Sequence, residues 1–474
     1  MIQKSLPALA LAISFTAVSA QAAERSADEL AFREIYKELV ETNTTLSSGS
    51  CTVASQQIAD RLTGAGMDSE NVQVMVHPDH PKEGNLFAVI PGSDTSLEPV
   101  LLLAHIDVVE AKREDWVRDP FTLYEEDGFF WARGSADDKS MAAIWADMFV
   151  NFAKDGYAPS RTIKMALTCG EETDTAFNGA NWLATEHRDL VDAAFVINEG
   201  GSGRTDGTVD SDGVGNVVVQ NVQVGEKLYQ DYRLTVTNPG GHSSQPKRDN
   251  AIYQMAAALQ KIGAHTFPAQ LNDTTRAYFS GVGATRDDAV GKAMLAVVAD
   301  PTDADAIAVL DEDKMYRSML RTSCVATMID GGHAVNALPQ SVTANVNCRI
   351  FPGRTPEAIM EELTGIMDDP AISIAKVRED KPIAKAPPLD PRVLDPMRAV
   401  VEKYYPGVPL IPTMSTGATD GLYFSAVGIP AYGFSALYHD PSGSGAHGLD
   451  EHISVDALYR GRKALTDLVH AYAD

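Results

Sequence analysis

Acidic and histidine side chains follow several apolar runs of this 474-residue chain, at the point where each run ends. These side chains are His105 and Asp107 after the run 100–104, Glu171 and Glu172 after 163–168, and Glu199 after 194–198. Short apolar runs of this kind predict buried strands of a parallel sheet. The carboxyl ends of such strands meet at one edge of the sheet, where open α/β sheets bind their ligands.

Two loops supply further groups of the same chemistry. Asp137 and Asp138 stand in the Gly-containing turn 133–139 at the start of a predicted helix, and His447 stands in the Gly-rich loop 442–448. Each signal has an ordinary explanation when taken alone. His105 and Asp107 could be a surface pair, the two aspartates could cap the helix, and Glu171 with Glu172 could be a solvated charge pair.

The set as a whole indicates a metal site. Two histidines and several carboxylates without a cysteine suit Zn²⁺, and Co²⁺ or Mn²⁺ would also fit. Adjacent carboxylates repel one another unless a cation or a shared proton offsets their charge. The excess of carboxylates matches two metal ions that share a bridging acid.

The elements that position these residues form two units. Strand-like runs at 72–76, 86–90, 100–104, 163–168 and 194–198 alternate with predicted helices at 139–155 and 178–187, which indicates an α/β domain with a mostly parallel sheet covered by helices. From about residue 226 the predicted order is β-α-β-β-α-β, the ferredoxin-like α+β pattern. An acidic, largely helical segment, 265–320, interrupts this second unit. A proline-rich stretch from Pro382 to Pro396 is predicted to be a stiff linker, after which the α/β pattern resumes.

We therefore expect a signal peptide at 1–22, a catalytic α/β domain at 23–225 and 389–474, and an inserted domain at 226–388. The segment 1–22 combines Lys4, a short apolar run and the cleavage pattern Ala20-Gln21-Ala22, and the run is too short to span a bilayer. We expect a secreted protein, periplasmic in a Gram-negative cell, without a membrane anchor.

Composition excludes several classes of protein. The net charge of −26 argues against a nucleic-acid partner, and 44% hydrophobic residues argue against disorder.

Four cysteines are too few for a disulfide scaffold in a chain of this length. Cys324 and Cys348 lie on successive predicted strands and could face each other, whereas Cys51 lies in a predicted helix and Cys169 in a buried strand. Free buried thiols are the preferred interpretation for all four.

The motifs in their order resemble the co-catalytic zinc aminoacylase/carboxypeptidase family, which includes glutamate carboxypeptidase, carboxypeptidase S, aminoacylase, acetylornithine deacetylase and succinyl-diaminopimelate desuccinylase. The resemblance runs from about residue 27 to the C-terminus. Its motifs are Ala104–Val109 (AHIDVV), Trp116–Phe121 (WVRDPF), Ala132–Lys139 (ARGSADDK), Gly170–Glu172 (GEE), Asn198–Gly201 (NEGG), Gly240–Ser244 (GGHSS), and His447-Gly448 with Glu451-His452.

The resemblance implies two Zn²⁺ ions per subunit. Their ligands would be Asp137 as the bridge, His105 and Glu199 on one metal, and Glu172 and His447 on the other. Asp107 would orient His105, Glu171 would be the general base, and the peptide bond after Asp137 would be cis.

The resemblance also assigns the inserted domain as a lid and a homodimerisation surface. From it, His242 would reach an active site, often that of the partner subunit, and stabilise the oxyanion. Arg349, Asn336 and Gly417 resemble the family's substrate contacts. Three of these residues also have an ordinary explanation, since Arg349 could be a structural strand residue, Asn336 a turn residue and His242 a loop residue. The acidic segment 265–320 is expected to shape the lid.

The implied function is zinc-dependent hydrolysis of an amide bond in a small peptide-like substrate with a free carboxylate, with a metal-bridging water activated by Glu171. The alternatives are an N-acyl-amino-acid deacylase with the same mechanism and a non-catalytic, metal-dependent periplasmic binding protein. The chain departs from the family pattern at Ser140, at Glu110 and at Leu449-Asp450, where Gly, Pro and Pro-Asn are frequent. None of these positions is a ligand or the base, so the departures bear on substrate choice.

Overall fold

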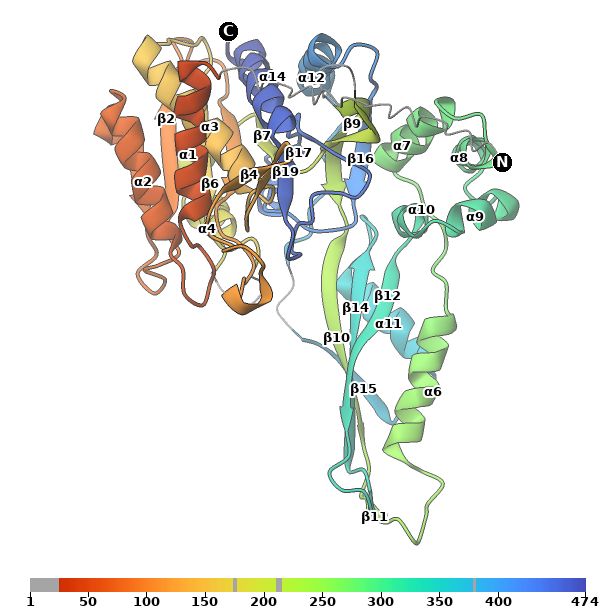
Figure 1. Ribbon diagram of the computed structural model, residues 1–474. Helices are drawn as coiled ribbons and strands as arrows, with labels where there is room; N and C mark the ends of the chain where they lie inside the picture. Colours follow the sequence, from red (N-terminus) through yellow and green to blue (C-terminus); the bar gives the residue numbers. More distant parts are fainter. Residues whose placement is uncertain (1–24, 174–176, 210–214, 378–380) are drawn as a thin grey trace, which may run out of the picture.

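The computed structural model describes residues 25–173, 177–209, 215–377 and 381–474 (Figure 1). A large sheet with helices packed on it forms one body, and a slender four-stranded unit projects away from it. The predicted signal peptide, 1–22, lies outside the described residues. Among the described residues, no helix has both the length and the apolar composition needed to cross a bilayer.

The central sheet has ten strands, and its middle is parallel, as the apolar runs predict. Its order is β1 (Val72–Met75), β2 (Asn85–Ile90), β6 (Ile163–Thr168), β3 (Val100–His105), β7 (Phe195–Asn198), β17 (Ala431–Gly433), β9 (Gly215–Glu226), β8 (Gly203–Val209) and β18 (Tyr438–His439), with β16 (Leu410–Ser415) paired to β9. Because β3, β6 and β7 run in the same direction side by side, their carboxyl ends lie together.

Helices cover both faces of this sheet. In β3, Leu102 and Ala104 join the core under one group of helices, and Leu101 and Leu103 join the core under the other. The first group is α1 (Ala27–Glu41), α2 (Cys51–Gly64), α3 (Lys139–Asp155), α12 (Pro391–Tyr404) and α14 (Val455–Ala473), and the second is α4 (Gly179–Glu186), α5 (Arg188–Val191) and α13 (Gly421–Ala426). Burial on both faces explains why these strands read as continuous apolar runs.

The inserted domain has the predicted ferredoxin-like topology. Its antiparallel sheet has the order β12 (Ser323–Gly331), β14 (Ser341–Ile350), β10 (Leu228–Thr237) and β15 (Ile372–Lys376). The helices α6 (Ala251–Ala264) and α11 (Pro356–Met367) share one apolar core with this sheet. At the far tip, β11 (Gly241–His242) pairs with β13 (Ala337–Leu338) (Figure 1).

The helical segment 265–320, expected to shape the lid, packs largely on the central sheet. Its helices are α7 (Asp273–Ala284), α8 (Ala289–Ala299), α9 (Ala304–Asp311) and α10 (Lys314–Leu320). They build a core with Ile411 of strand β16, which would otherwise be an uncovered edge of the central sheet. Gly281 permits this packing, because a Cβ there would lie 2.7 Å from Cδ1 of Ile411.

The proline-rich stretch is only partly a linker. Helix α12 begins at Pro391, and Pro396 lies inside it. Asp390 caps this helix by accepting a hydrogen bond from the Arg392 N–H, and proline is favoured at the first helical position because its missing N–H is not needed there. The prediction of a linker rested on proline content alone and overlooked Asp390 as a helix cap before Pro391.

The preference for free thiols is wrong. Cys51 at the start of α2 is bonded to Cys169, which follows β6, and Cys324 of β12 is bonded to Cys348 of β14. The second pair stands directly opposite in the β-ladder. The first depends on the packing of a helix against the sheet, which spacing along the chain does not reveal.

Replacing Cys51 and Cys169 together by alanine opens a cross-link that spans 118 residues. We expect the free energy of unfolding to fall by about 2–4 kcal/mol, because the unfolded chain regains loop entropy. Guanidinium unfolding without reductant measures this loss. The matched double variant at Cys324 and Cys348, with a separation of only 24 residues, should lose less. An unchanged midpoint in the first variant would contradict the pairing.

Candidate metal centre

The carboxyl ends of β3, β6 and β7 deliver the predicted residues to one place. His105 is the last residue of β3 and is 1% exposed, and Glu199 follows directly after β7. Glu171 and Glu172 follow β6 after a sharp turn at Gly170, whose φ is +102°. A Cβ on Gly170 would lie 2.0 Å from the carbonyl oxygen of Phe177, so this turn requires glycine.

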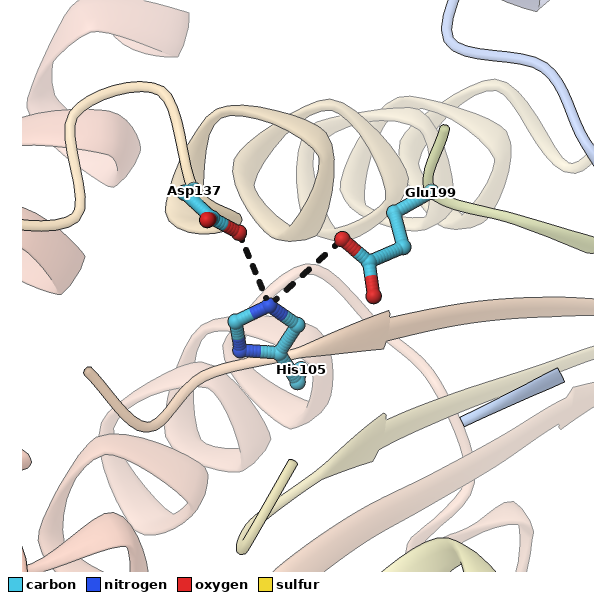
Figure 2. A group of neighbouring side chains, drawn as sticks. All are labelled: His105, Asp137 and Glu199. Carbon is cyan, nitrogen blue, oxygen red and sulfur yellow. Dashed lines mark hydrogen bonds and ion pairs between the residues drawn. The ribbon is translucent and has the colours of Figure 1, made fainter. Parts of the chain in front are cut away.

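In the first group of side chains, two carboxylates approach the same nitrogen of the His105 ring (Figure 2). Its Nε2 lies 3.1 Å from Oδ1 of Asp137 and 3.7 Å from Oε2 of Glu199. Its Nδ1 lies 3.1 Å from the backbone carbonyl oxygen of Asp107, which can only accept, so Nδ1 carries the hydrogen. In the neutral ring Nε2 is then a lone pair aimed at two carboxylates, an arrangement that a bound cation makes favourable.

The second group lies on the other oxygen of Asp137. His447 places Nε2 3.3 Å from Oδ2 of Asp137 and 3.0 Å from Oε1 of Glu172. His105, Asp137 and Glu199 form one set of ligand atoms that lie within 4.8 Å of one another, and Asp137, Glu172 and His447 form a second. Asp137 belongs to both sets, so the structure brings together all five ligands that the resemblance implies, with Asp137 between the two sets.

Asp107 contacts both the ring of His105 and the backbone of the two glutamates. Its carboxylate accepts hydrogen bonds from the backbone N–H groups of Glu171 and Glu172, at 3.3 and 3.0 Å. The nearer contact of Asp107 to His105 is through its carbonyl, because its Oδ1 lies 3.7 Å from the His105 Nδ1. Asp107 therefore fixes both the imidazole and the turn that carries the two glutamates.

The electrostatics of the site fit a cation. Burial, together with the neighbouring charge of Glu199, raises the pKa of Glu171 well above its usual range. Burial also raises the pKa of Glu199 to about 7, although His105 acts in the opposite direction. The site thus gathers more carboxylates than its two imidazoles can offset, and a divalent cation would favour the ionised form of each.

The loop that carries Asp137 has a cis peptide bond between Asp137 and Asp138, as the resemblance implies.

A buried acid that the sequence analysis did not single out, Asp420, lies near the charges of Glu171 and Glu199. It accepts hydrogen bonds from Oγ1 of Thr168 at 2.7 Å and Nδ2 of Asn178 at 2.8 Å. The sequence did contain a signal for Asp420, because this acid directly follows the Gly-containing segment 416–419.

The remaining predicted residues do not join the ligand group. His242 and Asn336 are exposed neighbours at the far tip of the inserted domain, where the Ser243 N–H donates to the Asn336 carbonyl (Figure 1). Arg349 lies on β14 with its guanidinium 4.5 Å from the ring centre of Tyr229. Gly417 follows β16, with its N–H bonded to Oγ of Ser415.

Known proteins share this sequence and fold. The chain is 27% identical over 394 residues to the N-fatty-acyl-amino acid synthase/hydrolase PM20D1 of Homo sapiens, covering 80% of this chain and 75% of that protein. It is 26% identical over 369 residues to the probable carboxypeptidase S-like 2 of Dictyostelium discoideum, covering 77% and 70%. An M20 family metallo-carboxypeptidase from Sulfolobus solfataricus has a similar structure, with a TM-score of 0.67 at 18% identity over 93% of this chain and 99% of that one.

The family model for Peptidase family M20/M25/M40 matches residues 101–471, which contain every ligand described above. The resemblance seen in the motifs is thereby confirmed. The chain belongs to this family and is a metallohydrolase acting on amide bonds.

Proposed function

We propose that this protein cleaves the amide bond of a small peptide substrate with a free carboxylate, as a carboxypeptidase or dipeptidase. The observation that carries the proposal is Glu171, a partly buried carboxyl whose ligand atom lies within 4.8 Å of those of His105 and Glu172, and whose backbone N–H is held by Asp107. A protein that only captured a metal or ligand would have no need of this group. Its presence argues against the non-catalytic alternative.

The residues of the chain have distinct roles in this reaction. His105 and Glu199 would hold one metal, Glu172 and His447 the other, and Asp137 both; the ions would supply Lewis-acid polarisation of the amide carbonyl and a lowered pKa of water. Glu171 takes the proton from the attacking water. It then passes that proton to the leaving amine, which a carboxyl kept from bulk water by burial is suited to do.

We propose Zn²⁺ as the metal. The donor sets combine imidazole nitrogen with carboxylate oxygen and contain no thiolate, since all four cysteines are in disulfides. Imidazole favours zinc over magnesium or calcium, and cobalt or manganese could replace it in the same ligands.

A second candidate is the deacylation of N-acyl amino acids. The similarity to the human N-fatty-acyl-amino acid synthase/hydrolase, over 80% of this chain, favours it. Both candidates need the same base and metals and differ only in what lies on the acyl side of the amide. Arg349 suits the carboxylate that both substrate classes carry, so it does not separate them.

A substrate panel distinguishes the two candidates. We expect the zinc-loaded protein to release amino acids from dipeptides faster than from N-acyl amino acids, and to lose both activities on chelation and regain them with Zn²⁺. Released amine, quantified by chromatography, measures the rates. A panel in which N-acyl amino acids are the faster substrates would favour the deacylase.

The control variant is Glu171→Ala. Loss of the proton carrier should lower kcat by about 10²–10⁴-fold or more. Metal analysis should still find two ions per chain, because Glu171 is not one of the five ligands. Full turnover in this variant would remove Glu171 from the mechanism.

We further propose that the protein acts as a homodimer through the inserted domain. Strand β12 is an edge of its sheet and exposes apolar side chains, with Val325 61%, Met328 71% and Ile329 62% exposed. Long exposed apolar edges invite pairing with another chain. His242 lies in β11, at the tip of this domain that points away from the central sheet (Figure 1), and would be placed to serve the partner's site.

Mixing two inactive variants tests this arrangement. His242→Ala and Glu171→Ala, unfolded and refolded together in equal amounts, should regain about a quarter of wild-type activity, because half the dimers are mixed and each has one complete site. Each variant refolded alone is the control. If His242 serves its own chain or has no role, the mixture will show no gain over the average of the two.

Finally, we propose that the protein is exported after removal of residues 1–22. The charged start, short apolar run and Ala-Gln-Ala pattern support this, and so do two disulfides, which persist in oxidising compartments.

Intact mass of the protein recovered outside the cytoplasm tests the export. We expect a chain that begins at Ala23 and is lighter than the reduced form by four hydrogens, because two disulfides have formed. A full-length, fully reduced chain confined to the cytoplasm would contradict the proposal.

A further inference from the structure

Glu451 lies outside both ligand groups, at the junction of the two loops that carry Asp137 and His447. A small sheet of β4 (Tyr124–Glu126), β5 (Phe129–Trp131) and β19 (His452–Ser454) creates this junction. The loop of Asp137 leaves β5, and the loop of His447 enters β19. Pairing of His452 with Trp131, and a bond from the Ala132 N–H to the Glu451 carbonyl at 3.3 Å, align segments more than 300 residues apart.

The carboxylate of Glu451 accepts four hydrogen bonds and is 1% exposed. Its Oε2 accepts from Nη1 of Arg133 at 2.6 Å and from the N–H of Gly134 at 3.0 Å. Its Oε1 accepts from the N–H groups of Ala136 and Asp137, both at 3.0 Å. Three of the four donors are backbone N–H groups of the loop that leads to Asp137. One of these three is the N–H of Asp137 itself.

Arg133 extends this network to the other loop. Its Nη2 donates to the carbonyl oxygen of Gly448 at 2.8 Å, next to His447. The guanidinium also lies 5.1 Å from the ring centre of Trp116, which restrains its plane. The Glu451–Arg133 pair therefore links the backbone at Asp137 to the backbone at His447.

A comparable pair elsewhere in the chain has no such connection. Nε of Arg462 donates to Oδ2 of Asp147 at 2.6 Å, and both side chains are buried. This pair joins α14 to α3, and the same guanidinium bonds Asp28 in α1. It therefore stabilises helix packing and bonds none of the loops that hold the ligands.

We propose that Glu451 is a positioning residue that sets the affinity and geometry of the two-metal site by holding Asp137 and, through Arg133, His447. The inference rests on the proposed metal site. Carboxylates that orient metal ligands from outside the ligand set typically contribute 10–100-fold to metal affinity. The same position would also let Glu451 govern kcat, because Asp137 is shared by both metals.

The test compares Glu451→Gln with Asp147→Asn as the matched control. In the first variant an amide N–H₂ faces N–H donors, so the loop loses part of its anchor while side-chain size is kept. Apoproteins are titrated with Zn²⁺ against a chromophoric chelator, and Co²⁺-loaded proteins are compared by visible absorption. We expect Glu451→Gln to bind about 10–100-fold more weakly, with an altered cobalt spectrum and a lower kcat at little-changed KM. The control should lose thermal stability but keep the wild-type affinity and spectrum.

Arg133→Lys keeps the charge but cannot reach Glu451 and the Gly448 carbonyl together, so it should also weaken metal binding. This variant decides the question if Glu451→Gln does not fold. Wild-type affinity and cobalt spectrum in the folded variants, or an equal loss in Asp147→Asn, would overturn the inference. Failure of the wild type to bind two metals would instead overturn the proposed function.

Discussion

Charge repulsion among closely spaced, partly buried carboxylates is the constraint on which the site depends. Asp137, Glu171, Glu172 and Glu199 converge around two imidazoles of the described residues, those of His105 and His447. Buried charges are stable only when paired or bound to a metal. The arrangement is therefore costly until a cation arrives, and rigid elements must hold it open. Three parallel strand ends supply that rigidity, and so do the Asp107 contacts to the backbone of both glutamates.

The catalytic body is built from both ends of the chain. His105 and Asp137 come from its first part and His447 from its last, so neither part supplies both ligand groups alone. The inserted domain separates them along the sequence, yet the helical segment 265–320 returns to pack on β16. The chain consequently passes between the central body and the inserted domain four times, between β9 and β10, α6 and α7, α10 and β12, and β15 and α12.

Sequence reasoning succeeded where the signal is local. Apolar runs that precede His105, Glu171 and Glu199 predict the strands, because parallel strands buried on both faces are nearly continuous apolar runs. The parallel direction of these strands then predicts that their carboxyl ends share one edge of the sheet. Sequence reasoning failed where a contact joins distant segments. The pairing of Cys51 with Cys169, the packing of α7 on Ile411 and the role of Asp420 all depend on which surfaces meet in three dimensions. His242 is an intermediate case. Its motif could be recognised in the sequence, but the sequence could not show that the inserted domain places His242 at its far tip (Figure 1).

Glu451 shows why burial alone does not reveal a residue's role. Glu451 with Arg133 and Asp147 with Arg462 are chemically alike, since each is a buried carboxylate with a guanidinium at 2.6 Å. They differ in the backbone that they hold. Asp147 joins helices whose packing is already fixed by apolar contacts, so its loss would cost stability without moving a ligand. Glu451 instead satisfies N–H groups of an irregular loop that has no ladder or helix to fix it. In such a loop the hydrogen bonds of Glu451 fix the backbone that carries Asp137, so a displacement there would reach both ligand groups at once.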